Sequence, residues 1–171
     1  EIVFLDLEEV LRIHADQVGR YGGSGQIRDK GLLESAVAMP QAGFGGQAMH
    51  SDLFEMAAAY LYHLIMNHPF VDGNKRTGTV CALAFLRLNG IRFQTDNPAL
   101  ADFVMAVAQG QKNKHQIARF LKQHSGSQDE PLGLQSRKIL KSLDYDITIQ
   151  WVDFHQECLT ARLLASKQRR T

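Results

Sequence analysis

The chain has 171 residues, of which 44% are hydrophobic, and this length and composition indicate one globular domain with a small appendage. Its 19 basic residues nearly balance its 18 acidic residues, which excludes a general electrostatic binder of membranes and makes direct nucleic-acid binding unexpected. Any anion-binding site must therefore be local.

The sequence shows neither the pattern of a membrane span nor that of a signal peptide. No stretch approaches the roughly 18 consecutive apolar residues of a membrane span, and the acidic start EIVFLDLEEV lacks the basic region of a signal peptide. Cys81 and Cys158 are far apart without CxxC spacing, so neither a disulfide nor a metal site is expected. We therefore expect a cytoplasmic protein.

The first 50 residues predict two helices and a glycine-rich segment. The stretch LDLEEVLRIHADQVGRYGG (5–23) repeats apolar residues at spacings of three and four and ends in two glycines, which is typical of an amphipathic helix. Asp29 is expected to cap a second helix over 30–39, which ends before Pro40. Residues 40–50 lack a periodic apolar face and predict a loop or short hairpin, either a plain connector or a flap over a ligand.

The middle of the chain predicts two core helices and two further amphipathic helices. Ser51 is expected to open the first, over 51–67, and the second starts at about Asn74 and ends at Asn89 and Gly90. Residues 91–95 predict a short extended piece. Residues 98–110 and 113–124 predict the last two helices, with Asn113 as the cap of the final one. The fold class expected for 1–124 is therefore all-α.

The rest of the chain differs in composition. Residues 125–133 (SGSQDEPLG) predict a linker, and residues 134–171 predict a C-terminal extension of small, mixed α/β content. This extension is short for an independent core. A fused inhibitor, a dimerisation element and a stabilising extension remain open as its role.

Residues 67–79, NHPFVDGNKRTGT, carry the chemistry. Pro69 takes His68 out of helical geometry at the exit of one helix, and Gly73 permits a sharp turn into the next, for which Asn74 is a competent N-cap. The first turn of that helix offers unpaired N–H groups, the positive end of the helix dipole and two cations, and so predicts an anion site.

These residue types in this order suggest phosphoryl transfer. Asp72 precedes the anion site, where a carboxylate can hold Mg²⁺ beside phosphate oxygens, and His68 is close enough in sequence to act as a general base on a hydroxyl. Each residue alone is more often structural: a helix-end histidine, a turn aspartate, or solvated cations at Lys75 and Arg76. Their conjunction favours the functional interpretation.

HPFVDGNKR resembles the motif of the Fic/Doc superfamily, His-x-Phe-x-Asp/Glu-Gly/Ala-Asn-Gly/Lys-Arg, and the resemblance to its death-on-curing (Doc) branch extends over roughly residues 2–124. It implies an all-α Fic/Doc-like helical bundle in which His68 is the catalytic base, Asp72 holds Mg²⁺ and Phe70 is buried support. Phosphate binding and transfer from ATP are then expected of a set of five motif residues: Gly73, Asn74, Lys75, Arg76, also assigned as catalytic, and Thr77. The resemblance also favours a flap over the target peptide, with candidates Gln41, Phe44, Gly45 and Gly46.

The branch bears on the reaction. AMP-transferring Fic proteins usually carry glycine where this chain has Lys75 and a second arginine where it has Thr79, whereas Doc toxins, which resemble kinases, carry the lysine and lack that arginine. The resemblance thus implies transfer of the γ-phosphate of ATP to a protein target, a translation elongation factor, with AMP transfer as the alternative. Gly73 and Gly78 are closer to the Fic form.

Regulation and competing functions complete the expectations. Ser51 and Glu55 match part of the superfamily's inhibitory motif but Met56 does not, so a separate antitoxin is the expected partner. A catalytically silent nucleotide- or antitoxin-binding module remains an alternative. A metal hydrolase using His63, His68 and Asp72 is disfavoured, because a five-residue step does not place two ligands on one helical face.

Overall fold

The computed structural model describes residues 1–128. In this part the chain forms six α-helices, one 3₁₀-helix and two small antiparallel sheets, which confirms the all-α prediction with a short hairpin. The predicted extension over 134–171, residues 129–133 of the predicted linker, and Cys158 lie outside the described residues. Cys81 is buried and free. Within residues 1–128, no helix is both long and apolar enough to cross a membrane.

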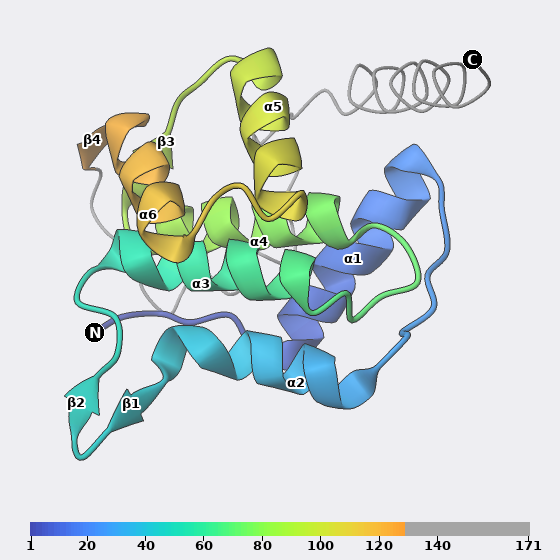
Figure 1. Ribbon diagram of the computed structural model, residues 1–171, viewed down its shortest axis with the longest axis horizontal. Coiled ribbons are helices and arrows are strands. Elements are labelled where there is room, and N and C mark those ends of the chain that lie inside the picture. Colours follow the sequence, from blue (N-terminus) through green and yellow to red (C-terminus); the bar gives the residue numbers. More distant parts are fainter. Residues whose placement is uncertain (129–171) are drawn as a thin grey trace.

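Two helices form the centre of the molecule, and the others surround them (Figure 1). The central pair is α3 (Leu53–Met66) and α4 (Asn74–Leu88). Around them lie α1 (Leu7–Tyr21), α2 (Lys30–Ala38), the 3₁₀-helix η1 (Met39–Gln41), α5 (Asn97–Ala108) and α6 (Lys114–Gln123). Their inward faces form one hydrophobic core, whose largest fully buried side chains include Tyr60, Phe70, Phe85, Leu61, Leu64 and Ile117.

The central pair packs closely because Gly78 has no side chain. A Cβ atom at this position would lie 3.2 Å from the backbone oxygen of Leu61 and 3.3 Å from side-chain atoms of Leu64 and Ile65. Such distances are tighter than ordinary van der Waals contact, so a larger residue would push the helices apart. Gly78 thereby fixes how closely α4 approaches α3.

The N-terminal segment is tied to this core by two polar side chains. The Tyr60 hydroxyl, fully buried, accepts from the Leu5 N–H at 3.0 Å and donates to the Leu5 carbonyl at 3.2 Å. Asn89 makes the same two kinds of bond to Val3, each at 2.9 Å. Backbone groups that no helix satisfies are paired in this way.

Five of the six described α-helices start at a side-chain cap. In each, an Asp or Asn side chain accepts a hydrogen bond from the backbone N–H three residues on: Asp6, Asp29, Asp52, Asp96 and Asn113. The predicted caps Asp29 and Asn113 are confirmed. Ser51 was expected to open α3, which is wrong by one residue, because Asp52 caps the helix while Glu55 accepts from the Ser51 N–H and hydroxyl.

The small sheets lie at the periphery. Strands β1 (Gly43–Phe44) and β2 (Gln47–Ala48) form the hairpin allowed for in the glycine-rich segment, with Gly45 and Gly46 at positive φ in its turn. Strand β3 (Ile91–Phe93) pairs with β4 (Ser125–Gln128). The linker predicted from residue 125 therefore starts too early, since its first four residues are a strand held by hydrogen bonds to β3.

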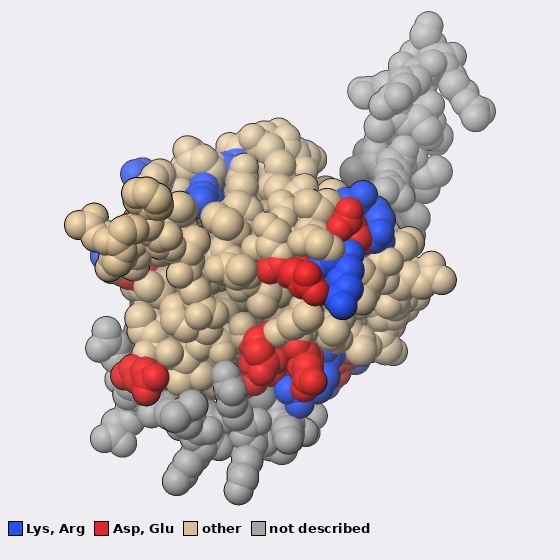
Figure 2. Space-filling view, turned by 90° about the horizontal axis from the view of Figure 1, so that it is seen from below, with Lys and Arg blue, Asp and Glu red and all other residues tan. Residues whose placement is uncertain are grey.

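Figure 2 shows the face of the molecule seen from below. Acidic and basic side chains of the described residues lie beside one another there, and much of the face carries neither. The described residues visible on this face form no extended area of a single charge sign, in keeping with the near balance of charges in the sequence.

Candidate active site

The loop between α3 and α4 carries His68 in an unusual backbone conformation. His68 follows the C-cap Asn67 and has φ of 49°, and it is the one described residue other than glycine with positive φ. Pro69 was expected to remove His68 from helical geometry. In the structure His68 leaves it by adopting a left-handed backbone conformation, which costs a residue with a side chain about 1–2 kcal/mol. The histidine side chain is thereby exposed beyond the end of α3.

The turn into α4 leaves the start of that helix open. Gly73, at φ of 81°, is the N-cap and provides no side-chain hydrogen bond, unlike the cap of each of the other described α-helices. The first-turn N–H groups of Asn74, Lys75 and Arg76 therefore have no capping acceptor. Together with the helix dipole they form a site suited to an anion.

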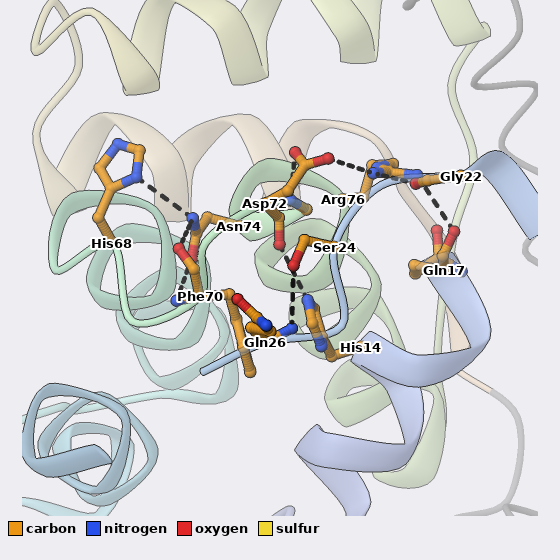
Figure 3. Close-up of polar contacts among 11 residues, drawn as sticks. His14, Gln17, Gly22, Ser24, Gln26, His68, Phe70, Asp72, Asn74 and Arg76 are labelled. Atoms are coloured by element: carbon orange, nitrogen blue, oxygen red, sulfur yellow. Dashed lines mark hydrogen bonds and ion pairs between the residues drawn. The ribbon is translucent and has the colours of Figure 1, made fainter. Parts of the chain in front are cut away.

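Asn74 does not cap α4, which corrects the sequence prediction. It is the first residue of the helix, its side chain is buried, and it points back into the loop (Figure 3). The amide oxygen accepts from the Phe70 N–H at 2.9 Å, and the amide nitrogen donates to the Phe70 carbonyl at 2.9 Å. The same nitrogen lies 3.2 Å from Nδ1 of His68, so Asn74 ties the loop together and contacts the candidate base.

Asp72 and Arg76 lie side by side at the other end of the loop. One carboxylate oxygen of Asp72 accepts from the Gly73 N–H at 2.7 Å, and the other lies 3.7 Å from Nη2 of Arg76. The Arg76 guanidinium also donates to the carbonyls of Gln17, at 3.1 Å, and Gly22, at 2.9 Å. It thus binds the C-terminal end of α1, and these two bonds use two of the five N–H groups of the guanidinium.

His14 supports the loop from α1 and was not among the predicted site residues. Its Nε2 donates to the Asp72 carbonyl at 2.9 Å, and its ring stacks on Phe70 with centroids 3.7 Å apart. Burial lowers the pKa of His14, and the nearby Arg76 acts in the same direction. Phe70 is buried as expected. Its stacking partner, His14, is a buried residue of the first helix, where it occupies one of the positions with apolar spacing, so the sequence did not mark it as a site residue.

Gly23 is a second residue that sequence analysis missed. It has φ of 117°, and a Cβ atom there would lie 2.2 Å from the Asp72 carboxylate and 3.1 Å from Nη2 of Arg76. The glycine pair after α1 therefore does more than end a helix, because Gly23 makes room for the Asp72 side chain. Only the adjacent glycines in the sequence hinted at such a close approach.

The remaining motif residues divide into two groups. Lys75, partly exposed, lies in the uncapped first turn of α4, where a phosphate would meet it. Thr77 is fully buried and its N–H donates to the Gly73 carbonyl at 2.9 Å, so its position does not support the predicted phosphate contact. Thr79 is also fully buried, and its hydroxyl donates to the Lys75 carbonyl at 2.8 Å.

The structure does not bring the hairpin to the motif. Gln41 ends η1, and Phe44, Gly45 and Gly46 lie in or beside the hairpin turn, at the N-terminal end of α3. His68 follows the opposite end of this 14-residue helix (Figure 1), whose own length is about 21 Å at 1.5 Å per residue. A flap role for these residues is not supported by their position.

The residues present fit a magnesium ion that is completed by substrate, but not a metal site made by protein alone. The Asp72 side chain is 52% exposed beside the open start of α4, and Mg²⁺ commonly takes one or two carboxylates plus phosphate oxygens and waters. Among residues 1–128 no group of three or more His, Cys, Asp or Glu side chains is arranged to hold a metal. The hydrolase that was considered from His63, His68 and Asp72 therefore has no structural support.

The chain is similar in sequence to a protein family and to known proteins. A family model described as the Fic/DOC family matches residues 4–86. The chain is 37% identical over 120 residues to the protein kinase doc of Escherichia phage P1, covering 70% of this chain and 94% of that protein. It is 44% identical over 93 residues to the toxin Doc of Mycolicibacterium smegmatis, covering 54% of this chain and 69% of that protein.

Proposed function

Because the chain belongs to the Fic/DOC family, we propose that it is a toxin of the Doc type that transfers the γ-phosphate of ATP to a hydroxyl group of a protein. The names of its relatives, a protein kinase and a toxin, support both halves of this proposal. The observation that carries it is the uncapped start of α4, which lies between the His68 side chain and the Asp72–Arg76 pair.

Each residue has a chemical task in this reaction. The N–H groups of the first turn of α4, with Lys75 and Arg76, bind phosphate oxygens of ATP and offset their charge. His68 accepts the proton of the target hydroxyl, whose oxygen then forms a bond to the γ-phosphorus while the bond to the β,γ-bridging oxygen breaks and ADP leaves. The work of the protein is mainly positioning and charge neutralisation.

Asp72 is the residue that would hold Mg²⁺. Its exposed carboxylate lies next to the phosphate-binding turn, and the ion, when bound, neutralises charge on the phosphate oxygens. The Arg76 guanidinium lies 3.7 Å from Oδ2 of Asp72 and attracts this carboxylate toward the phosphate-binding turn.

Phosphate transfer is favoured over AMP transfer by positions 75 and 79. Lys75 adds a cation at the start of α4, and Thr79 is buried with its hydroxyl bonded to the helix backbone, so it presents no second cation to a triphosphate. Gly73 and Gly78, the two glycines that resemble the AMP-transferring proteins, are each explained by the fold of this chain. Gly73 has positive φ, and Gly78 lets α4 approach α3.

The biological setting follows from the same family. We propose that the target is a translation factor in the cytoplasm, that its modification stops growth, and that a separate antitoxin protein blocks the toxin. The relative named as a toxin supports an antitoxin as partner, and the relative named as a protein kinase supports a protein as substrate. The near balance of charges in the sequence favours neither nucleic acid nor membrane as the target.

Labelled ATP separates the reactions. The protein is incubated with cell extract and with ATP labelled either at the γ or at the α position, and protein-bound label is measured. Phosphate transfer gives label from the γ position alone, whereas AMP transfer gives label from the α position. Protein that binds ATP but transfers neither label, and that does not stop growth, is the catalytically silent module and contradicts the proposal.

A variant pair assigns the base. His68→Ala should reduce transfer by about 10²–10⁴-fold, the usual contribution of a general base, with little change in stability because the side chain is exposed. His115→Ala is the matched control, since this histidine lies on α6 with its side chain 85% exposed. Full activity of the His68 variant would remove this residue from the catalytic role.

A further inference from the structure

The connection between α1 and α2 runs along the motif loop, although about 40 residues separate the two in sequence. The backbone N–H groups of Arg28 and Asp29 both donate to the Pro69 carbonyl, at 2.7 and 3.0 Å, and the Val71 N–H donates to the Gln26 carbonyl at 3.0 Å. Figure 1 shows the two segments beside each other at the same end of the α3–α4 pair. The loop that carries the candidate base is therefore braced by another part of the chain.

The Arg28 side chain extends this brace to His68 itself. Its Nε donates to the His68 carbonyl, and its Nη2 donates to the Asn67 carbonyl at 2.8 Å. Both acceptors lie at the end of α3, where carbonyl groups lack helical partners and the helix dipole favours a cation. The arginine thus binds the carbonyl groups of the two peptide bonds that flank the Cα atom of His68, the residue in the left-handed conformation.

We propose that Arg28 is a positioning residue of the active site, which holds the His68 backbone in its left-handed conformation and so directs the imidazole toward the phosphate-binding turn. A histidine at φ of 49° persists only where surrounding contacts impose it. The contacts within α3 are weak there, because the His68 N–H donates to the Ile65 carbonyl at a long 3.3 Å. The Arg28 side chain adds a restraint from outside the motif, beside the backbone bonds that the same segment makes to Pro69 and Val71.

The role requires an arginine rather than any cation. The guanidinium presents N–H groups in a fixed planar fork, so that Nε and Nη2 reach two neighbouring carbonyls at once, whereas a lysine ammonium is a single point. Arg28 is exposed, so its removal leaves no cavity in the core. Loss of the fork should therefore act on the geometry of His68 rather than on the fold as a whole.

The test combines turnover with a spectroscopic view of His68, and its kinetic part rests on the proposed phosphate transfer. Arg28→Gln and Arg28→Lys are compared with Lys30→Gln, a control that removes an exposed cation two residues away, paired with Glu34 at 3.6 Å. With ATP as the probe, kcat of Arg28→Gln should fall about 10-fold to 100-fold, as expected for a displaced catalytic group, while KM for ATP stays near that of the parent. Arg28→Lys should recover only part of the loss.

Histidine-labelled protein gives the second measurement. The Cα and ring resonances of His68, assigned with the His68→Ala variant, report its backbone and ring conformation, and they should shift in Arg28→Gln but not in Lys30→Gln. Unchanged His68 resonances, together with kcat equal to that of the control, would overturn the proposal and leave Arg28 as a surface cap of α3. If the parent protein transfers no phosphate, the proposed function fails, yet the resonances of His68 still decide the role of Arg28.

Discussion

Nδ1 of His68 lies 3.2 Å from the side-chain amide nitrogen of Asn74. The Phe70 backbone fixes the orientation of this amide group: the Phe70 N–H requires the amide oxygen as acceptor, and the Phe70 carbonyl requires the amide nitrogen as donor. Nδ1 of the neutral ring is therefore the acceptor, and the proton is on Nε2. Uptake of a substrate proton then requires that the Asn74 amide leaves Nδ1 or that the ring rotates, so Asn74 is in a position to control the base.

The variant Asn74→Asp tests this relationship. A carboxylate can still accept from the Phe70 N–H, but its second oxygen replaces a donor with an acceptor next to Nδ1 and attracts a proton there. We expect the nitrogen resonance of His68 Nδ1 to change from an unprotonated to a protonated type. Transfer should fall by at least about tenfold, because the carboxylate cannot donate to the Phe70 carbonyl as the amide nitrogen does, and the loop that carries His68 is displaced. An unprotonated Nδ1 in the variant would contradict the proposed hydrogen-bond direction.

Three glycines near the end of α1 form a graded test of the Asp72 environment. Gly25→Ala enters open space at ordinary φ, Gly22→Ala enters open space at φ of 77°, and Gly23→Ala meets the Asp72 carboxylate at 2.2 Å. We expect no effect from the first, a loss of about 1–2 kcal/mol in unfolding free energy from the second, and a similar loss plus weakened Mg²⁺-dependent transfer from the third. Urea unfolding and turnover at varied Mg²⁺ separate strain from displacement of Asp72. Equal turnover of the Gly22 and Gly23 variants would show that the close approach has no role in the site.

Tyr60→Phe should destabilise the fold without altering the site. Its hydroxyl serves both backbone groups of Leu5, and their loss leaves a buried donor and acceptor unpaired, at a cost of about 1–3 kcal/mol. The midpoint of urea unfolding should fall, and phosphate transfer by the folded protein should stay at the parental level. An unchanged midpoint would mean that water replaces the hydroxyl.

Acid sensitivity should come partly from His63. Burial lowers its pKa from 6.5 to about 4, and its Nε2 has no partner among the described residues. The unfolded chain therefore takes up this proton below about pH 6.5 while the folded protein does not, so the free energy of unfolding falls as the pH drops from about 6.5 toward 4, by about 1–3 kcal/mol.

His63→Gln should remove this part of the pH dependence. Between pH 7 and pH 5 the unfolding free energy of the variant should fall less than that of the parent, because Gln carries no titrating group. The same comparison with His115→Gln, an exposed histidine on α6, controls for general changes in charge. A parallel pH dependence in the His63 variant and the parent would exclude His63 as the source.

The sequence by itself determined the features that depend on neighbouring residues. Helix periodicity, the caps Asp29 and Asn113, the exit of α3 at Pro69 and the sharp turn at Gly73 are local backbone preferences, and they sufficed to place the base, the carboxylate and the anion site within one short loop. The cap of α4 was mistaken because Asn74 satisfies the Phe70 backbone instead, a competition that propensity does not reveal.

The tertiary structure decided what surrounds this loop. The loop is contacted by three residues of α1 and its connection to α2: His14, Gly23 and Arg28. Arg28 and His14 are 40 and 58 positions from their partners in the loop, and no local sequence pattern predicts contacts over such separations. The hairpin shows the opposite outcome. Its glycines predicted its form, but its place relative to His68 depends on the direction and length of α3, which sets the two at opposite ends of a rigid helix.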